Sequence, residues 1–103
     1  MLISKVRNME SSRGNKIANQ FIIETDINEL SGNCTETFQS YESIIAIRER
    51  FNSEEKTRKI TLDSTYWDYS VTTGKYRNIF LGETKKETQK KIDAGIYTLA
   101  NLN

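Results

Sequence analysis

The chain has 103 residues, a net charge of +1, 36% hydrophobic residues and a mean hydropathy of −0.66. This length suits one domain, residues 1–103, and no apolar run reaches the roughly eighteen residues of a membrane-spanning helix. The absence of histidine excludes Ser-His-Asp and Cys-His catalysis, and one cysteine cannot complete a structural zinc site. We therefore expect neither an enzyme nor a bound metal or cofactor.

The same features bear on location. Residues 1–12 lack the apolar segment of a secretory signal, and Cys34 alone cannot form an internal disulfide. Both observations favour the reducing cytoplasm. Cys34 is expected to be an inert, half-buried strand residue, because no neighbouring positive charge would lower the pKa of its thiol.

The first half of the chain predicts β-strands. Segments rich in β-forming residues lie at 2–9, 19–25, 34–41, 42–51 and 58–63, with loops or turns at 11–16, 26–33 and 52–56. The third and fourth segments adjoin, which predicts a tight hairpin at Tyr41 and Glu42. Gly32 is the expected position of positive φ in its loop. Alternation in the fourth segment puts Ile45 and Ile47 on the same side of the strand.

The second half predicts two short helices. Apolar residues recur at helical spacing over 72–81, and Gly82 is a typical residue after a helix C-terminus. Thr84 and Glu87 form a capping-box pattern that starts the next helix, which ends near Gly95. This helix has almost no apolar stripe, so it is expected on the surface. The tail, 95–103, is expected to return to the sheet.

Together these elements predict an α+β fold. About five strands would form a mostly antiparallel sheet or small open barrel over the strand-rich residues 1–63. The aromatic segment and the helices occupy 64–103. A helix-turn-helix is not favoured, because Thr88 and Lys91 fall where the second helix would need apolar residues.

The strongest candidate for a binding surface is YWDYSVTTGKYRN, residues 66–78. Tyr66 and Tyr69 could stack on bases with Lys75 and Arg77 on phosphates, or they could anchor a protein partner. The alternative is that a small domain with few aliphatic residues uses its aromatic side chains in the core. On this basis Trp67 and Phe80 are expected mainly in the core, and the four binding candidates at the surface.

Charge is segregated along the chain and gives two further sets of candidates. Arg13 and Lys16 lie in the loop SSRGNK, whose backbone N–H groups could converge on an anion. The middle of the chain, 17–55, carries eight acidic and two basic residues. An acidic surface there could mimic nucleic-acid phosphates. The residues proposed for it are Glu24, Asp26, Glu29, Glu36 and Glu42.

Several segments combine into a recognisable pattern. They are SSRGNKIANQFII (11–23), FQSY (38–41), IIAI (44–47), LDSTYWDYS (62–70), TTGKYRNIFLGE (72–83) and GIYTLANLN (95–103). Together they resemble a family of small proteins of bacteriophages and mobile elements, largely of Gram-positive bacteria, with no assigned activity. The resemblance covers nearly the whole chain, and WDYS-x-TT-x-KYRN is specific for it. It implies a cytoplasmic accessory protein.

Two hypotheses follow for function. The first is a non-catalytic accessory protein that binds a host protein or nucleoprotein enzyme, with inhibition of a defence nuclease such as a CRISPR effector as one form. The second is direct binding of DNA or RNA through the basic and aromatic residues, with affinity that falls steeply with salt. Either a monomer or a homodimer is compatible with the sequence, since sheet edges are available for pairing.

Overall fold

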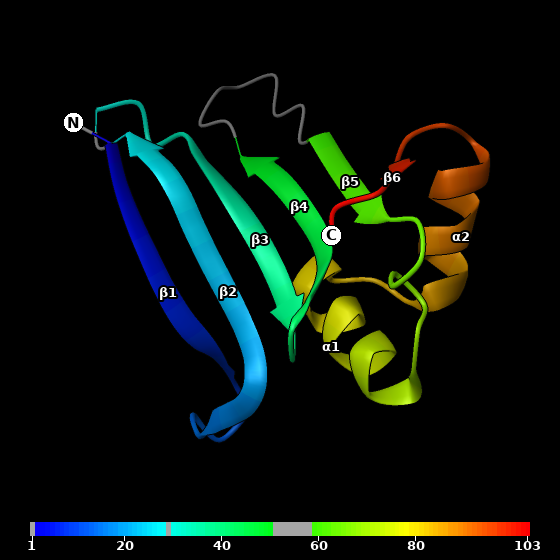
Figure 1. Ribbon diagram of the computed structural model, residues 1–103, viewed down its shortest axis with the longest axis horizontal. Helices are drawn as coiled ribbons and strands as arrows, with labels where there is room; N and C mark the ends of the chain where they lie inside the picture. The colour runs from blue at the N-terminus through cyan, green and yellow to red at the C-terminus, as the bar shows by residue number, and fades with distance from the viewer. Residues whose placement is uncertain (1, 29, 51–58) are drawn as a thin grey trace.

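Six strands form one open sheet in the computed structural model, which describes residues 2–28, 30–50 and 59–103 (Figure 1). The strands are β1 (Leu2–Glu10), β2 (Lys16–Asn28), β3 (Cys34–Ser40), β4 (Ser43–Arg50), β5 (Lys59–Asp63) and β6 (Thr98–Ala100). They lie in the sheet in chain order, antiparallel from β1 to β5, with β6 parallel to β5. The predicted α+β class is confirmed, and of the two alternatives the open sheet is the one found.

The described strands agree with the predicted segments to within one residue, except that β2 is longer at both ends and that a sixth strand is present. β2 begins at Lys16, which is inside the predicted loop 11–16 and three residues before the predicted start at 19. β2 continues to Asn28 and so includes the start of the predicted loop 26–33, although Gly32 does have the expected positive φ of 76°. The tail returns to the sheet as predicted, and it does so as a sixth strand, β6. The prediction had placed all strands within residues 1–63 and so did not include this strand. The predicted turn at 52–56 lies outside the described residues.

Two helices connect β5 to β6, as a parallel return requires a crossover. They are α1 (Val71–Leu81) and α2 (Lys85–Asp93), and Figure 1 shows α1 near the ends of β3 and β4, with α2 beside β5. Gly82 ends α1 with φ of 70° and donates its N–H to Asn78 O. The capping box of Thr84 and Glu87 starts α2, so the predicted start and stop signals are confirmed.

The core lies between α1 and one face of the sheet. A row of paired residues, Ile22, Phe38, Ala46 and Leu62, crosses four strands on this face. All four are buried, and Phe80 of α1 stacks on Phe38 with ring centroids 5.7 Å apart. Phe80 is therefore a core residue as predicted, and Trp67 packs against the core while partly buried.

A β-bulge changes the alternation of β4. Phe38 pairs with Ala46 while Gln39 pairs with Ile44, so Ile45 is the extra residue between them. Ile45 and Ala46 are both buried on the helix side. The prediction that Ile45 and Ile47 share a side was wrong, because strict alternation assumes a regular ladder.

Polar contacts attach α2, which lacks an apolar stripe. The carboxylate of Glu83 accepts hydrogen bonds from Thr88 Oγ1 at 2.7 Å, from Lys91 Nζ at 2.8 Å and from the Tyr97 hydroxyl at 2.7 Å. Burial, with Glu83 beside it, raises the pKa of Tyr97 to about 12. The helix is largely exposed as predicted, and Thr88 is its buried residue.

Candidate binding site

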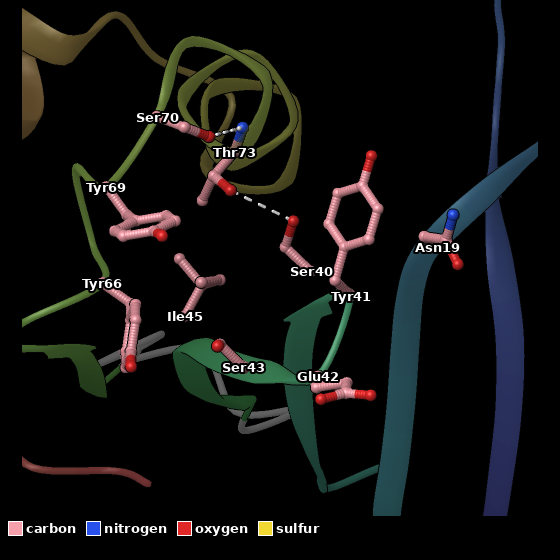
Figure 2. Close-up of a pocket in the computed structure, with 10 residues that line it drawn as sticks. All are labelled: Asn19, Ser40, Tyr41, Glu42, Ser43, Ile45, Tyr66, Tyr69, Ser70 and Thr73. Atoms are coloured by element: carbon pink, nitrogen blue, oxygen red, sulfur yellow. Dashed lines mark hydrogen bonds between the residues drawn. The ribbon is translucent and has the colours of Figure 1, made fainter.

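A pocket of about 480 Å³ opens between the turn that joins β3 to β4 and the start of α1 (Figure 2). Its lining residues are Asn19, Ser40, Tyr41, Glu42, Ser43, Ile45, Tyr66, Tyr69, Ser70 and Thr73. Figure 2 shows Tyr66 and Tyr69 on one side of the hollow and Tyr41 on the other, with Ile45 and the Ser40–Thr73 pair between them. Three aromatic rings therefore surround one concave, hydroxyl-rich space.

The first wall of the pocket is held by the turn between β3 and β4. Tyr41 occupies its first position with φ of 54°, where glycine is favoured. Its N–H donates to Asn19 O at 2.7 Å, and Gln39 Nε2 donates to its carbonyl at 2.8 Å. These bonds fix the backbone of the turn, and Tyr41 stays 55% exposed beside the pocket. The positive φ costs about 1–2 kcal/mol for a residue other than glycine.

The second wall is the segment that follows β5. The buried carboxylate of Asp63 accepts the backbone N–H groups of Tyr66 at 2.7 Å and Thr65 at 3.0 Å, which turns the chain away from the sheet. The rings of Tyr66 and Tyr69 then meet edge to face, with centroids 5.2 Å apart and planes at 67°. Tyr66 is half-buried, while Tyr69 is 68% exposed at the mouth.

The floor of the pocket comes from β3, β4 and α1. The hydroxyls of Ser40 and Thr73 are hydrogen-bonded at 3.1 Å, and the bulged Ile45 presents a buried aliphatic surface beside them. Ser70 caps α1, where its Oγ accepts the Thr73 N–H at 3.1 Å. The floor therefore offers both apolar and hydroxyl contacts.

Glu42 supplies the charge of the pocket. Among the described residues that line it, Glu42 is the one with a carboxylic side chain, and none is a lysine or an arginine. It is exposed, and no ion-pair partner lies within reach in the part of the chain that the structure describes. The pocket thus combines aromatic rings with an unpaired carboxylate.

Arg77 contradicts its predicted surface position. Its side chain is 1% exposed and donates to Trp67 O at 2.6 Å, Asp68 Oδ1 at 3.3 Å and Asn78 Oδ1 at 3.0 Å. Its guanidinium carbon lies 5.2 Å from the centre of the Trp67 ring. Arg77 therefore attaches α1 to the aromatic segment. The helical pattern of the sequence does not show that this arginine has a structural role. Lys75 is exposed as predicted but lies outside the tyrosine pocket.

The loop SSRGNK satisfies its own backbone. Ser11 Oγ accepts the N–H groups of Arg13 at 3.3 Å and Asn15 at 3.2 Å, and Ser11 O accepts the Gly14 N–H. The converging N–H groups expected to bind an anion are thus already used within the loop. The exposed side chains of Arg13 and Lys16 stay available to a ligand.

The predicted acidic residues do not share one unpaired surface. Glu36 is buried and paired with Arg48 at 3.0 Å, so its predicted surface position was wrong. Glu24 is partly buried and lies 3.4 Å from Arg7, whereas Asp26 and Glu42 are exposed. Glu29 lies outside the described residues.

The two aspartates at the start of the aromatic segment have structural partners. Asp63 anchors backbone N–H groups, and Asp68 pairs with Arg77 at 3.3 Å and with Lys85 at 2.6 Å. Among the described residues, no group of three or more His, Cys, Asp or Glu could hold a metal ion. Cys34 is half-buried, as predicted, and its burial raises the pKa of the thiol.

Sequence reasoning found three of the pocket residues, namely Tyr66, Tyr69 and, as part of the acidic set, Glu42. It missed Tyr41, which was assigned only to a hairpin. One signal was present: a two-residue turn built from Tyr and Glu, where Gly or Asn is usual, indicates that the side chain there has another use. The remaining lining residues converge only through the bulge and the crossover.

The fold and this pocket define a small α+β protein with a tyrosine-lined pocket. The chain belongs to the family of unknown function DUF8033, whose pattern matches residues 4–95. No curated protein and no solved structure matches the chain. Neither helix of the described residues is long and apolar enough to span a membrane.

Proposed function

We propose that this chain is a non-catalytic accessory protein that binds a protein partner through the tyrosine pocket. The observation that carries the proposal is the arrangement of Tyr41, Tyr66 and Tyr69 around one hollow. Tyrosine is enriched at the centres of protein interfaces, where a ring contributes a large contact area for few lost rotamers. Two of these rings are more than half exposed.

The strained turn supports this proposal. The fold could form the same hairpin with glycine at position 41, and a tyrosine there carries a cost in stability. Such strain is commonly found at functional sites, because selection for a contact outweighs the cost. The ring of Tyr41 is exposed, so burial in the core does not account for it.

The expected partner is a host protein or nucleoprotein enzyme. The resemblance to proteins of phages and mobile elements favours a target in the infected cell, such as a defence nuclease. The phosphate-mimic version of this idea has less support than the pocket does, because Glu36 is buried and Glu24 is paired.

Affinity purification with matched variants tests the proposal. Tagged wild type, Tyr69→Ser and Ile79→Ser would be incubated with extract of a Gram-positive host before and after nuclease treatment, and retained proteins would be quantified by mass spectrometry. Ile79 is the control because its side chain is also largely exposed, 53%, but it lies on α1 outside the pocket. We expect a protein that wild type and Ile79→Ser retain and Tyr69→Ser loses. Equal retention by all three, or retention only before nuclease treatment, would contradict the proposal.

Direct nucleic-acid binding is the second candidate. Lys75 and Lys85 line a neighbouring cleft of about 620 Å³ at the start of α1, which gives a cationic surface next to the aromatic segment. Trp67 fluorescence during titration with single-stranded and duplex oligonucleotides at low and high salt would detect such binding. Affinity that falls with salt and with the Lys75→Ala and Lys85→Ala changes would favour this candidate. Arg77 is unsuitable for this test, because its loss would disturb the fold.

A further inference from the structure

The walls of the tyrosine pocket have the geometry of a cage. The rings of Tyr66 and Tyr69 stand at 67° to one another, so one ring presents its edge to the face of the other. Tyr41 lies across the hollow from them in Figure 2. The faces of aromatic rings carry negative potential, so rings that surround a space attract a cation placed within it.

The charge of the pocket points the same way. Glu42 lines the hollow without an ion-pair partner among the described residues, and no lysine or arginine is among the described lining residues. The Ser40 and Thr73 oxygens at the floor can accept hydrogen bonds from a donor such as an ammonium or guanidinium group. An anionic ligand would face Glu42 without a neutralising side chain from the lining.

We propose that this pocket takes up a single lysine or arginine side chain of the protein partner. The three tyrosines would surround the inserted side chain, the Ser40 and Thr73 oxygens at the floor would accept hydrogen bonds from its charged end, and Glu42 would balance its charge. This inference rests on the proposed function and adds the chemistry of the contacted residue. It predicts a partner with a basic residue exposed at its contact surface.

Peptide probes test the inference without knowledge of the partner. Acetyl-Ala-Lys-Ala-amide and acetyl-Ala-Arg-Ala-amide would be titrated into protein with isotope-labelled tyrosine rings, followed by NMR. The neutral controls replace lysine with norleucine and arginine with citrulline. We expect the cationic peptides to shift the ring signals of Tyr41 and Tyr69 and to bind at least about fivefold more tightly than the neutral ones.

Two variants identify the groups responsible. Glu42→Gln should weaken the cationic peptides by up to about fivefold and leave the neutral ones unchanged, as loss of an exposed charge partner predicts. Ile79→Ala, outside the pocket, should change neither. Equal binding of cationic and neutral peptides, or no ring shift over the millimolar range, would overturn the inference. If the peptides gave either of these results and Tyr69→Ser still lost a protein partner in the affinity purification, the proposed function would stand. Only the preference for a cationic side chain would be removed.

Discussion

Tyr41 is the residue where local stability and the proposed function conflict. Its positive φ is strained for a tyrosine, and about half of its side chain is exposed. We predict that Tyr41→Gly raises the free energy of unfolding by about 0.5 kcal/mol, since relief of strain exceeds the entropy lost by a glycine. Urea denaturation measures this change.

The neighbouring residue provides the control. Glu42 belongs to the same turn but does not have positive φ, so Glu42→Gly should lower the free energy of unfolding by about 0.5 kcal/mol. If Tyr41→Gly lost more stability than Glu42→Gly, the ring would have a structural role, and the argument from strain would fail.

Arg77 is predicted to be essential for folding. Its removal would leave Trp67 O and Asp68 without their buried donor, and buried charged networks are costly to break. Arg77→Ala should lower the free energy of unfolding by about 3 kcal/mol, while Lys75→Ala on the exposed side of α1 should change it by less than about 0.5 kcal/mol. Thermal or urea denaturation compares the two. If both changes lowered the free energy of unfolding by similarly small amounts, Arg77 would not be needed to attach α1 to the aromatic segment.

At the scale of elements, Asp63 joins three parts of the chain. Its carboxylate accepts N–H groups from Thr65 and Tyr66, which start the aromatic segment, and from Leu102 at 2.7 Å in the tail after β6. Burial alone would raise the pKa of Asp63, but these hydrogen bonds outweigh it and hold the pKa below its usual range. One side chain at the end of β5 thus fixes both the pocket wall and the tail.

The lowered pKa of Asp63 predicts a dependence of stability on pH. Because the folded pKa lies below the unfolded value of about 3.9, the stabilisation is complete above about pH 4 and is lost as pH falls through the folded pKa. Asp63→Asn should lower the free energy of unfolding by about 2 kcal/mol at pH 7 and flatten the decline below pH 4. Urea denaturation from pH 7 to pH 2 measures both effects, with Asp93→Asn at the exposed end of α2 as control. An acid decline as steep in Asp63→Asn as in the wild type would contradict this role.

Elements were predictable where a local signal exists. Glycine stops, the capping box and β-rich segments are all encoded within a few residues, so both helices and five of the six strands follow from them. The bulge at Ile45 and the polar attachment of α2 depend on partners distant in the chain. Thr88 is an example: nothing in the sequence of α2 indicates that this polar residue is the one that the fold buries.

At the scale of the whole molecule, the pocket is a product of topology. It combines β2, the β3–β4 turn and the segment 66–73, which are brought together only by the sheet order and the position of α1. The sequence could supply candidate tyrosines but not their convergence. The same topology divides the predicted acidic surface. Strand pairing places Glu36 beside Arg48 on the face of the sheet that α1 covers, so Glu36 is not available at the surface.

The sheet edges favour a monomer. β1 has two register irregularities, between Ile3 and Lys5 and between Asn8 and Glu10, and β6 has three residues. Irregular and short edge strands resist pairing with another chain. We predict a monomer at micromolar concentration by size-exclusion chromatography with light scattering. A dimer disrupted by Val6→Asp, a change at a residue 68% exposed on β1, would contradict this prediction.

Site-directed photo-cross-linking tests the central claim most directly. Benzoylphenylalanine would replace Tyr69, Tyr41 or, as control, Lys86 on the exposed part of α2, in protein expressed in a Gram-positive host. We predict one covalent, nuclease-resistant protein adduct from positions 69 and 41 and none of the same mass from position 86. Adducts that are equal at all three positions, or that disappear with nuclease, would contradict the claim that the tyrosine pocket binds a protein.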